Sequence, residues 1–257
     1  MEQYEKSGFI VLPGFFSAAK DGPIQHAMDA LLAALATDDG AGIAREKDSG
    51  AVRSIYGAHR LADAFKSLVS SPQLVEAARQ IVGGAVSLHQ SHVNVKQALV
   101  GKGYFWHQDW TFFHYLDGMP DTRMVGAAIY LTDNRPESGP LLVIPGSHLW
   151  HLQKPGIAKS FAAENSSVRH DFNAGLEASG LLTPDELRWL TASNSVVSLP
   201  GRAGDVLLYD GLLAHASTEN FSEADRGLYL AFYTSVENRL INPTRPDYVA
   251  ERHPKPL

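Results

Sequence analysis

Cysteine is absent from this chain of 257 residues. Its absence excludes disulfides, thiolate metal sites, iron–sulfur clusters and cysteine nucleophiles. Any metal held by side chains must therefore have nitrogen and oxygen ligands. Basic residues are also few, since 22 Lys and Arg stand against 28 Asp and Glu, a net charge of -6. That balance argues against a general binder of nucleic acid or of anionic membranes.

Long apolar runs and nucleotide-binding motifs are missing as well. No run approaches the roughly 20 apolar residues of a membrane span. The N-terminal run MEQYEKSGFIVLPGFF has no basic region before its apolar residues, unlike a signal peptide. Neither G-x-G-x-x-G nor a P-loop occurs, so the usual signals of nucleotide cofactors are lacking. We expect a cytoplasmic protein, a monomer or homodimer, whose partner is a small-molecule substrate.

The remaining pattern predicts a mainly β protein in a single domain, residues 1–257. Helices are expected over 23–37, from Pro72 to a stop at Gly83-Gly84, and after a capping box that begins at Thr183. Short strands are expected at 86–98, 124–132, 141–144, 205–210, 212–216 and 227–235. Strands without regular intervening helices favour a sandwich or barrel. Residues 151–182 fit either a lid over a site or a plain surface excursion.

His107 and Asp109 stand two residues apart within an aromatic run. On an extended segment such residues point to the same face, so one strand end brings both side chains to one metal. The pair alone is a weak signal, because a chain with 11 histidines contains it by chance about half the time. A hydrogen-bonded, partly buried histidine beside aromatic residues is the competing interpretation.

A distal histidine and an arginine favour the metal hypothesis. His215 ends an apolar strand, where an imidazole needs a partner, either a metal or a hydrogen bond to backbone or to Tyr209. Two imidazoles and one carboxylate bind one face of a ferrous ion and leave the opposite face open. Arg226, eleven residues later, is placed to hold an anionic co-substrate against that face. A strand-edge arginine that reaches solvent is the alternative.

The strand at 86–98 carries one polar face, made of Gln90, His92, Asn94 and Lys96. In a closed sheet such a face either sees water or lines a polar cavity, where Lys96 would suit an anionic ligand. The aromatic residues around the His-x-Asp pair are expected mostly in the core, with Trp110 as a candidate wall of a substrate pocket.

Five short motifs complete the pattern: YFWHQDW at 104–110, His114 with DGMP at 117–120, LTDN at 131–134, SGPL at 138–141 and PGSH at 145–148. Together they resemble the phytanoyl-CoA dioxygenase (PhyH) family, and within it ectoine hydroxylase and bacterial hydroxylases of free amino acids. The resemblance extends over residues 4–250. It implies a double-stranded β-helix of the jelly-roll or cupin-like type with flanking N-terminal α-helices. It also implies Fe(II), 2-oxoglutarate and O2.

The same resemblance implies roles for the residues of the metal and co-substrate site. The implied catalytic iron ligands are His107, Asp109 and His215. Arg226 is the implied partner of the far carboxylate of 2-oxoglutarate, with further contacts from Lys96 and Ser217. A carboxylate at position 109 favours hydroxylation, since related halogenases have a small residue there. The implied reaction is hydroxylation of an unactivated C–H with release of succinate and CO2.

The resemblance also implies substrate contacts, at Gln90, Arg245 and Arg53. Two departures from the ectoine hydroxylases stand beside the metal motif: Gln108 replaces a serine, and TFF at 111–113 replaces an acidic run with a tryptophan. We therefore expect a free L-amino acid, ahead of ectoine or another small natural-product intermediate. No basic cluster is present for the phosphates of an acyl-CoA. A zinc hydrolase and a metal-binding cupin without oxygenase activity are the alternatives from other classes.

Overall fold

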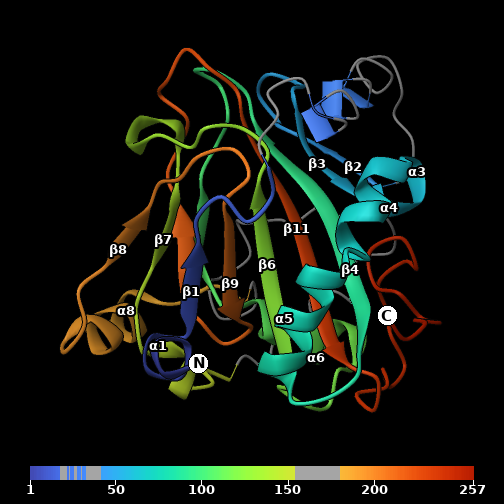
Figure 1. The fold of residues 1–257 in the computed structure, drawn as a ribbon. Coiled ribbons are helices and arrows are strands. Elements are labelled where there is room, and N and C mark those ends of the chain that lie inside the picture. Colours follow the sequence, from blue (N-terminus) through green and yellow to red (C-terminus); the bar gives the residue numbers. More distant parts are fainter. Residues whose placement is uncertain (18–21, 23, 26–27, 30, 33–41, 154–179) are drawn as a thin grey trace.

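Two antiparallel sheets face each other in this computed structural model, which describes residues 1–17, 22, 24–25, 28–29, 31–32, 42–153 and 180–257. The major sheet has the strand order β1-β9-β6-β11-β4-β3-β2, and the minor sheet has the order β5-β10-β7-β8 (Figure 1). The major-sheet strands are β1 (Phe9–Leu12), β2 (Ile43–Arg45), β3 (Val52–Tyr56), β4 (Val86–Lys96), β6 (Met124–Tyr130), β9 (Val206–Asp210) and β11 (Arg226–Ser235). The minor-sheet strands are β5 (Tyr104–His107), β7 (Leu141–Val143), β8 (Val197–Leu199) and β10 (His215–Ser217). The predicted mainly β sandwich is thus confirmed.

Short helices surround the two sheets. They are α1 (Glu2–Ser7), α3 (Ala58–Leu61), α4 (Asp63–Val69), α5 (Pro72–Val82), α6 (Asp109–Asp117) and α8 (Pro184–Thr191), with 3-10 turns η1 (Pro136–Ser138) and η2 (Ser147–Leu149). Figure 1 shows α5 lying across β6, β11 and β4, the strands that it contacts. None of the helices in the described part of the chain has the length and apolar character needed to cross a membrane.

The long strands β4 and β11 are buried on both faces, and the two faces differ in character. Toward α5, the apolar side chains of Val93, Val95 and Tyr229 join Leu74 and Ala78 in one core. Toward the minor sheet, the alternate positions of β4 carry polar side chains. Because the side chains of a strand alternate between faces, one strand supplies both a core and the wall of a cavity.

Several predicted elements are confirmed, with strand ends shifted by up to three residues. Helix α5 begins at Pro72 and ends at Gly83, whose φ of 78° is a left-handed helix end. The amide of Glu186 donates to Oγ1 of Thr183, and the Glu186 carboxylate accepts from the Thr183 amide, which is the expected capping box of α8. Strand β10 starts only at His215, because the amides of Leu212 and Leu213 bond to Asp210 in a turn.

Other expectations were incomplete or fall outside the described residues. Helix α6 was not predicted, because its sequence, DWTFFHYLD, is rich in aromatic residues that favour strands; packing decides its conformation. In the expected helix at 23–37, the described residues 24–25, 28–29 and 31–32 are helical, and the others lie outside the described part. Most of the segment at 151–182, namely 154–179, lies outside it too.

Candidate active site

The His-x-Asp pair joins the end of a strand to the start of a helix. His107 is the last residue of β5, and Asp109 is the first residue of α6. Between them Gln108 is extended, with φ of -119° and ψ of 123°, so the side chains on either side of it point the same way. The fully buried Gln108 amide donates to the carbonyls of Trp150 and Leu212. It therefore anchors this junction from behind instead of facing the cavity.

His215 lies directly opposite His107 in the antiparallel pairing of β10 with β5. Their ring centroids are 4.2 Å apart. Nδ1 of His107 bonds to the Phe105 carbonyl at 2.7 Å, and Nδ1 of His215 bonds to the Leu213 carbonyl at 2.9 Å. Since a carbonyl only accepts, each ring carries a proton on Nδ1, and each Nε2 faces Asp109, where a neutral imidazole would offer its lone pair to a metal.

The Asp109 carboxylate lies between the two imidazoles. Its Oδ1 is 3.4 Å from Nε2 of His107, and its Oδ2 is 3.6 Å from Nε2 of His215. One ligand atom from each of the three residues lies within 4.8 Å of the other two, a spacing that suits a single metal ion. The donor set of two imidazoles and one carboxylate is the facial triad of non-haem iron oxygenases, and the structure brings the three predicted side chains together.

Electrostatics reinforce this arrangement. Burial raises the pKa of Asp109, but the two imidazoles that face the carboxylate, His215 and His107, outweigh it, and the pKa lies well below its usual range. Burial lowers the pKa of His215 to about 4, helped by the charge of His107. The carboxylate is therefore ionised and His215 is neutral near neutral pH, as metal ligation requires. Burial lowers the pKa of His107, but the hydrogen bond and charge of Asp109 outweigh it and raise that pKa, so a metal ion would compete with a proton at this ring.

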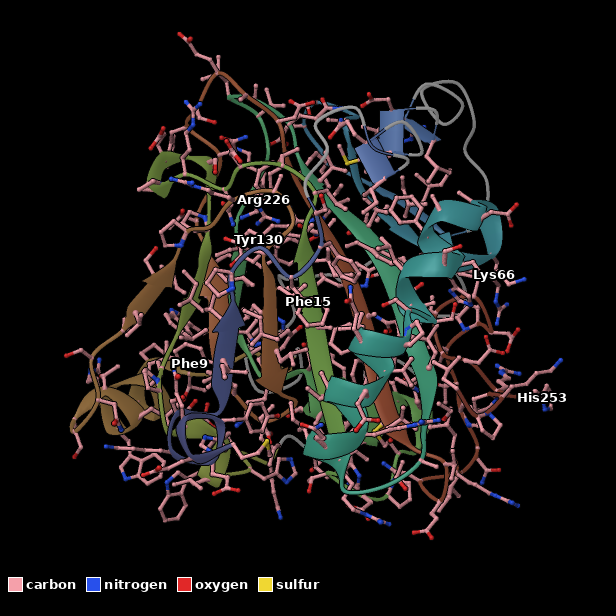
Figure 2. All side chains as sticks on the ribbon, viewed as in Figure 1. Phe9, Phe15, Lys66, Tyr130, Arg226 and His253 are labelled. Atoms are coloured by element: carbon pink, nitrogen blue, oxygen red, sulfur yellow. The ribbon has the colours of Figure 1, made fainter. Side chains whose placement is uncertain are left out.

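Arg226 projects from the first residue of β11 into the same cavity. Its Nη1 donates to Oδ1 of Asn94 at 2.8 Å, and its Nη2 donates to the Gly139 carbonyl at 2.9 Å. Its Nε is buried and has no hydrogen-bond partner among the described residues. Figure 2 shows Arg226 near Tyr130, inside the fold, whereas Lys66 and His253 project outward. The alternative of a strand-edge arginine that reaches solvent is therefore wrong.

A second buried basic side chain lies beside Arg226. Lys96 is only 1% exposed, and its Nζ donates to Oγ of Ser217 at 2.7 Å and to the Thr218 carbonyl. Burial, together with the charges of Arg226 and Arg53, lowers the pKa of Lys96 to about 6. Two buried basic side chains with an unpaired N–H fit a small dicarboxylate, whose charge would compensate theirs.

The cavity between the sheets is lined by both polar and apolar side chains. Its polar lining includes Asn94, Tyr104, Tyr209, Ser217 and Arg226, and its apolar lining includes Leu141, Ala216, Leu228, Leu230 and Phe232, with His92 beside them. His107, Asp109 and His215 line the same cavity. The polar face of β4 therefore faces a cavity, and the alternative of a water-exposed outer face is wrong.

Gln90 lies beside His92 on β4 but is not among the lining residues of the cavity. It is buried, and its Nε2 lies 3.2 Å from Nδ1 of His92, while its Oε1 has no partner among the described residues. The His92 ring is tilted against Tyr56, with centroids 5.0 Å apart, and stacks on Phe232. Burial lowers the pKa of His92 to about 4, so this imidazole is neutral at neutral pH.

Arg245 belongs to a buried ion-pair cluster next to the cavity. Its Nε donates to Oδ1 of Asp117 at 2.7 Å, and its Nη2 donates to Oδ2 of the same carboxylate. Nε2 of His89 lies 3.0 Å from that Oδ2. The guanidinium also lies over the ring of Phe113, which packs edge-on against the cavity residue Phe232.

Arg53 and Trp110 are engaged with their own neighbours. Arg53 bonds to Glu46 and to the Gly103 carbonyl, and its guanidinium lies 3.8 Å from the centroid of the Tyr104 ring. Trp110 is buried, stacks on His114, and donates from Nε1 to the Asp121 carbonyl. Neither side chain is among the lining residues of the cavity.

Sequence reasoning missed two tyrosines that the structure places at the site. The Tyr104 hydroxyl lies 2.5 Å from Nδ2 of Asn94 and 3.1 Å from Oγ of Ser54. The Tyr209 hydroxyl donates to Oδ2 of Asp109 at 3.0 Å. In the sequence, Tyr104 looked like a core aromatic residue, and Tyr209 looked like a possible hydrogen-bond partner of His215. Only the pairing of distant strands brings both to the cavity.

The family model for phytanoyl-CoA dioxygenase (PhyH) matches residues 4–228. This chain belongs to that family. The ectoine dioxygenase of Bordetella parapertussis is 34% identical over 263 aligned residues, which cover 98% of this chain and 81% of that protein. The L-proline trans-4-hydroxylase of Streptomyces griseoviridis is 32% identical over 257 residues, covering 99% of this chain and 92% of that protein. The predicted family and the predicted enzyme class, a dioxygenase, are thus confirmed.

Solved structures support the same conclusion. EctD from S. alaskensis, solved with 2-oxoglutarate and 5-hydroxyectoine, is 31% identical, covers 98% of this chain and 82% of its own, and has a TM-score of 0.84. The carbocyclase SnoK of nogalamycin biosynthesis, at 20% identity and a TM-score of 0.72, shares the fold. The expected double-stranded β-helix is confirmed by these neighbours.

Proposed function

We propose that this enzyme hydroxylates an unactivated C–H of a free L-amino acid. The chain is an iron- and 2-oxoglutarate-dependent hydroxylase of its family, and EctD has been solved with both iron and 2-oxoglutarate. One observation supports this chemistry most directly: the triad and the buried, partly unpaired Arg226 line one cavity. A zinc hydrolase would have no use for that cation.

The triad and the two buried basic side chains would divide the work of holding iron and co-substrate. His107, Asp109 and His215 would hold the iron by one face, which leaves the cavity side open to co-substrate and oxygen. Arg226 would pair the far carboxylate of 2-oxoglutarate, with Lys96 and Ser217 as further contacts. Bound iron would let O2 oxidise both molecules: one oxygen atom enters the C–H as a hydroxyl, and the other enters 2-oxoglutarate, which leaves as succinate and CO2.

The apolar lining would receive the aliphatic part of the substrate. Leu228, Leu230 and Phe232 line it and exclude water from the reacting carbon. Holding a small molecule against these walls fixes which carbon faces the metal, and this orientation is the protein's main contribution to rate.

Polar groups behind this wall would recognise the ends of an amino acid. The Asp117 carboxylate accepts hydrogen bonds from Nε and Nη2 of Arg245. We assign the remaining nitrogen, Nη1, as a hydrogen-bond donor to the substrate carboxylate. The buried, unpaired Oε1 of Gln90 is an acceptor for the substrate ammonium. Arg53 and Trp110 are the remaining proposed substrate residues, and both lie outside the cavity lining. Arg53 would act indirectly, because its guanidinium lies over the ring of Tyr104, which lines the cavity.

Among free amino acids, L-proline is the first candidate. The S. griseoviridis L-proline trans-4-hydroxylase matches this chain over 92% of its own length, against 81% for the B. parapertussis ectoine dioxygenase. The departures at Gln108 and at 111–113 also separate this chain from the ectoine hydroxylases. Ectoine is the second candidate, because the B. parapertussis ectoine dioxygenase is 34% identical to this chain, against 32% for the L-proline hydroxylase.

A substrate screen tests the proposal. The iron-loaded enzyme is incubated with 2-oxoglutarate, ascorbate and either ectoine, L-proline or one of the other L-amino acids. We expect succinate formation to rise with one free amino acid, and that amino acid to gain the mass of one oxygen. A product from ectoine alone would overturn the amino-acid proposal while leaving the hydroxylase chemistry intact.

A further inference from the structure

Tyr209 contacts the metal site from the neighbouring major sheet. Its hydroxyl donates to Oδ2 of Asp109 at 3.0 Å, and its ring packs against His215 with centroids 5.3 Å apart. The side chain is 3% exposed. An ionised carboxylate only accepts, so the phenol is the donor in this hydrogen bond.

Gly126 provides the space that the Tyr209 ring occupies. The two residues are direct partners in the pairing of β6 with β9. A Cβ built on Gly126 would lie 2.5 Å from Cζ and 2.7 Å from Cε1 of Tyr209. Both distances are shorter than real contacts, so any larger residue at 126 must displace the phenol. In β-sheets an aromatic ring often covers a glycine on the neighbouring strand and fills the space that the missing side chain leaves.

The ring has little room to move elsewhere. Phe232 lies edge-on to Tyr209, with centroids 6.2 Å apart, and is itself the cross-strand partner of Gly126 on the other side, in β11. Gly126 thus lies between two aromatic residues of the cavity wall. The hydroxyl of Tyr209 is fixed in place by packing on three sides, from Gly126, Phe232 and His215.

We propose that Tyr209 is a positioning residue that orients the Asp109 carboxylate for metal binding, and that Gly126 is required because it makes room for Tyr209. A carboxylate has two oxygens, and a free one can turn or bind a metal through both. A donor fixed on Oδ2 keeps that oxygen engaged and leaves Oδ1 for the metal. One coordination position thereby stays open to co-substrate. The inference concerns the triad, so it does not depend on the identity of the substrate.

Two variants test the proposal, with metal affinity as the main measurement. Binding of Fe(II) and Co(II) is measured by anaerobic titration calorimetry of the apo-enzyme. Tyr209→Phe removes only the hydroxyl, and we expect affinity to fall roughly 10–100-fold, the usual effect of losing such a partner. Gly126→Ala keeps the hydroxyl but displaces it, and we expect a loss of similar size. Because both changes break the same contact, the double variant should lose little more than either single variant.

Tyr130→Phe is the matched control. Tyr130 is also buried, and its hydroxyl donates to the Leu199 carbonyl at 2.9 Å, away from the triad. We expect it to lower the free energy of unfolding without changing metal affinity. The absorption spectrum of the Co(II) form gives a second measurement, since a change in carboxylate coordination alters the ligand field.

Three results would overturn the proposal. Tyr209→Phe could bind metal with parent affinity and an unchanged Co(II) spectrum. Tyr130→Phe could weaken metal binding as much as Tyr209→Phe does, which would indicate a general effect of stability. Gly126→Ala could fold and bind metal normally, which would remove the role of Gly126; if that variant fails to fold, Tyr209→Phe alone decides the role of the hydroxyl.

Discussion

Oδ1 of Asn94 accepts a 2.8 Å hydrogen bond from Nη1 of Arg226 across the neighbouring strands β4 and β11. The Gly139 carbonyl accepts from Nη2 of the same guanidinium. Neutral acceptors, not a carboxylate, therefore orient this buried cation. Burial lowers the pKa of Arg226 to about 10, which still leaves it charged at neutral pH. An anion that enters the cavity meets a charge that no bound carboxylate has already neutralised.

Arg226→Lys should weaken 2-oxoglutarate binding, because lysine keeps the charge but loses the planar fork. Charge-assisted hydrogen bonds contribute about 1.5–3 kcal/mol each, so we expect KM for 2-oxoglutarate to rise roughly 10–100-fold. Initial rates of succinate formation measure it. Asn94→Asp should act in the same direction, since it would neutralise Arg226 in place. Arg123→Lys, which changes an exposed arginine, should leave KM unchanged; an unchanged KM in Arg226→Lys would contradict the assignment.

Asp109→Ala should abolish turnover, because it leaves two imidazoles without the anionic ligand. We expect metal affinity to fall by at least roughly 100-fold, beyond the effect of losing an outer-sphere partner. Calorimetric titration with Fe(II) and the rate of succinate formation check both expectations. Asp63→Asn is the control, since it removes an exposed carboxylate far from the triad in sequence. Full-rate hydroxylation by Asp109→Ala would refute the triad.

The Asp117–Arg245 pair should make stability depend on pH in the acid range. Burial raises the pKa of Asp117, but the charge of Arg245 outweighs it, and the pKa falls from 3.8 to about 2. A depressed carboxyl pKa stabilises the fold fully above about pH 4, and that contribution is lost as pH falls toward 2. A pKa lowered by this amount contributes about 2 kcal/mol to the free energy of unfolding at neutral pH. Urea unfolding between pH 7 and pH 2.5 measures it.

Asp117→Asn should cost more than that contribution, about 3 kcal/mol at pH 7, because it leaves Arg245 buried without a counter-charge. The loss should shrink as pH falls toward 2. Asp185→Asn breaks an exposed pair with Arg188 and should cost less than about 1 kcal/mol. Equal losses of unfolding free energy in the two variants would show that the buried pair stabilises the fold no more than an exposed pair does.

Lys96 should take up a proton when 2-oxoglutarate binds. Its pKa of about 6 results from burial and the charges of Arg226 and Arg53, against weaker opposite effects of Glu46 and Glu219. Above pH 6 the free enzyme therefore holds Lys96 largely neutral, and an entering anion favours the charged form. Affinity for 2-oxoglutarate should weaken as pH rises from 6.5 to 8.5, by up to about tenfold per pH unit.

Calorimetry of the metal-loaded enzyme under nitrogen checks this coupling. Proton uptake gives different binding heats in two buffers of unequal ionisation enthalpy. Lys96→Met should remove that difference while it lowers affinity, and the surface variant Lys66→Met should not, because Lys66 is exposed on α4. Identical heats in both buffers for the parent enzyme would contradict a neutral Lys96.

The sequence was most informative where spacing alone determines direction. His107 and Asp109 are close in sequence, so local extended backbone is enough to bring them together. The polar face of β4 was also predictable, because alternation assigns its residues to one side. Sequence could not decide whether that side faced water or a cavity, since the answer depends on the minor sheet that covers it.

Roles that depend on distant partners were beyond the sequence. Asp117 and Arg245 are separated by 128 positions, and their ion pair forms only when the C-terminal segment packs beside α6. Tyr209 reaches Asp109 only because β9 pairs with β6 opposite a glycine. Gln108 shows the converse: a residue next to two ligands in sequence turns its side chain away from them.

Strand β10 has only three residues, and its first, His215, must sit opposite His107. A slip of one position would turn that imidazole out of the sandwich, because successive side chains alternate between faces. A metal ion can therefore be bound by both histidines in only one register of β10 against β5. The metal would cross-link β5 and β10 of the minor sheet. Loading the enzyme with iron should therefore slow hydrogen exchange at the amides of these two strands more than anywhere else in the fold.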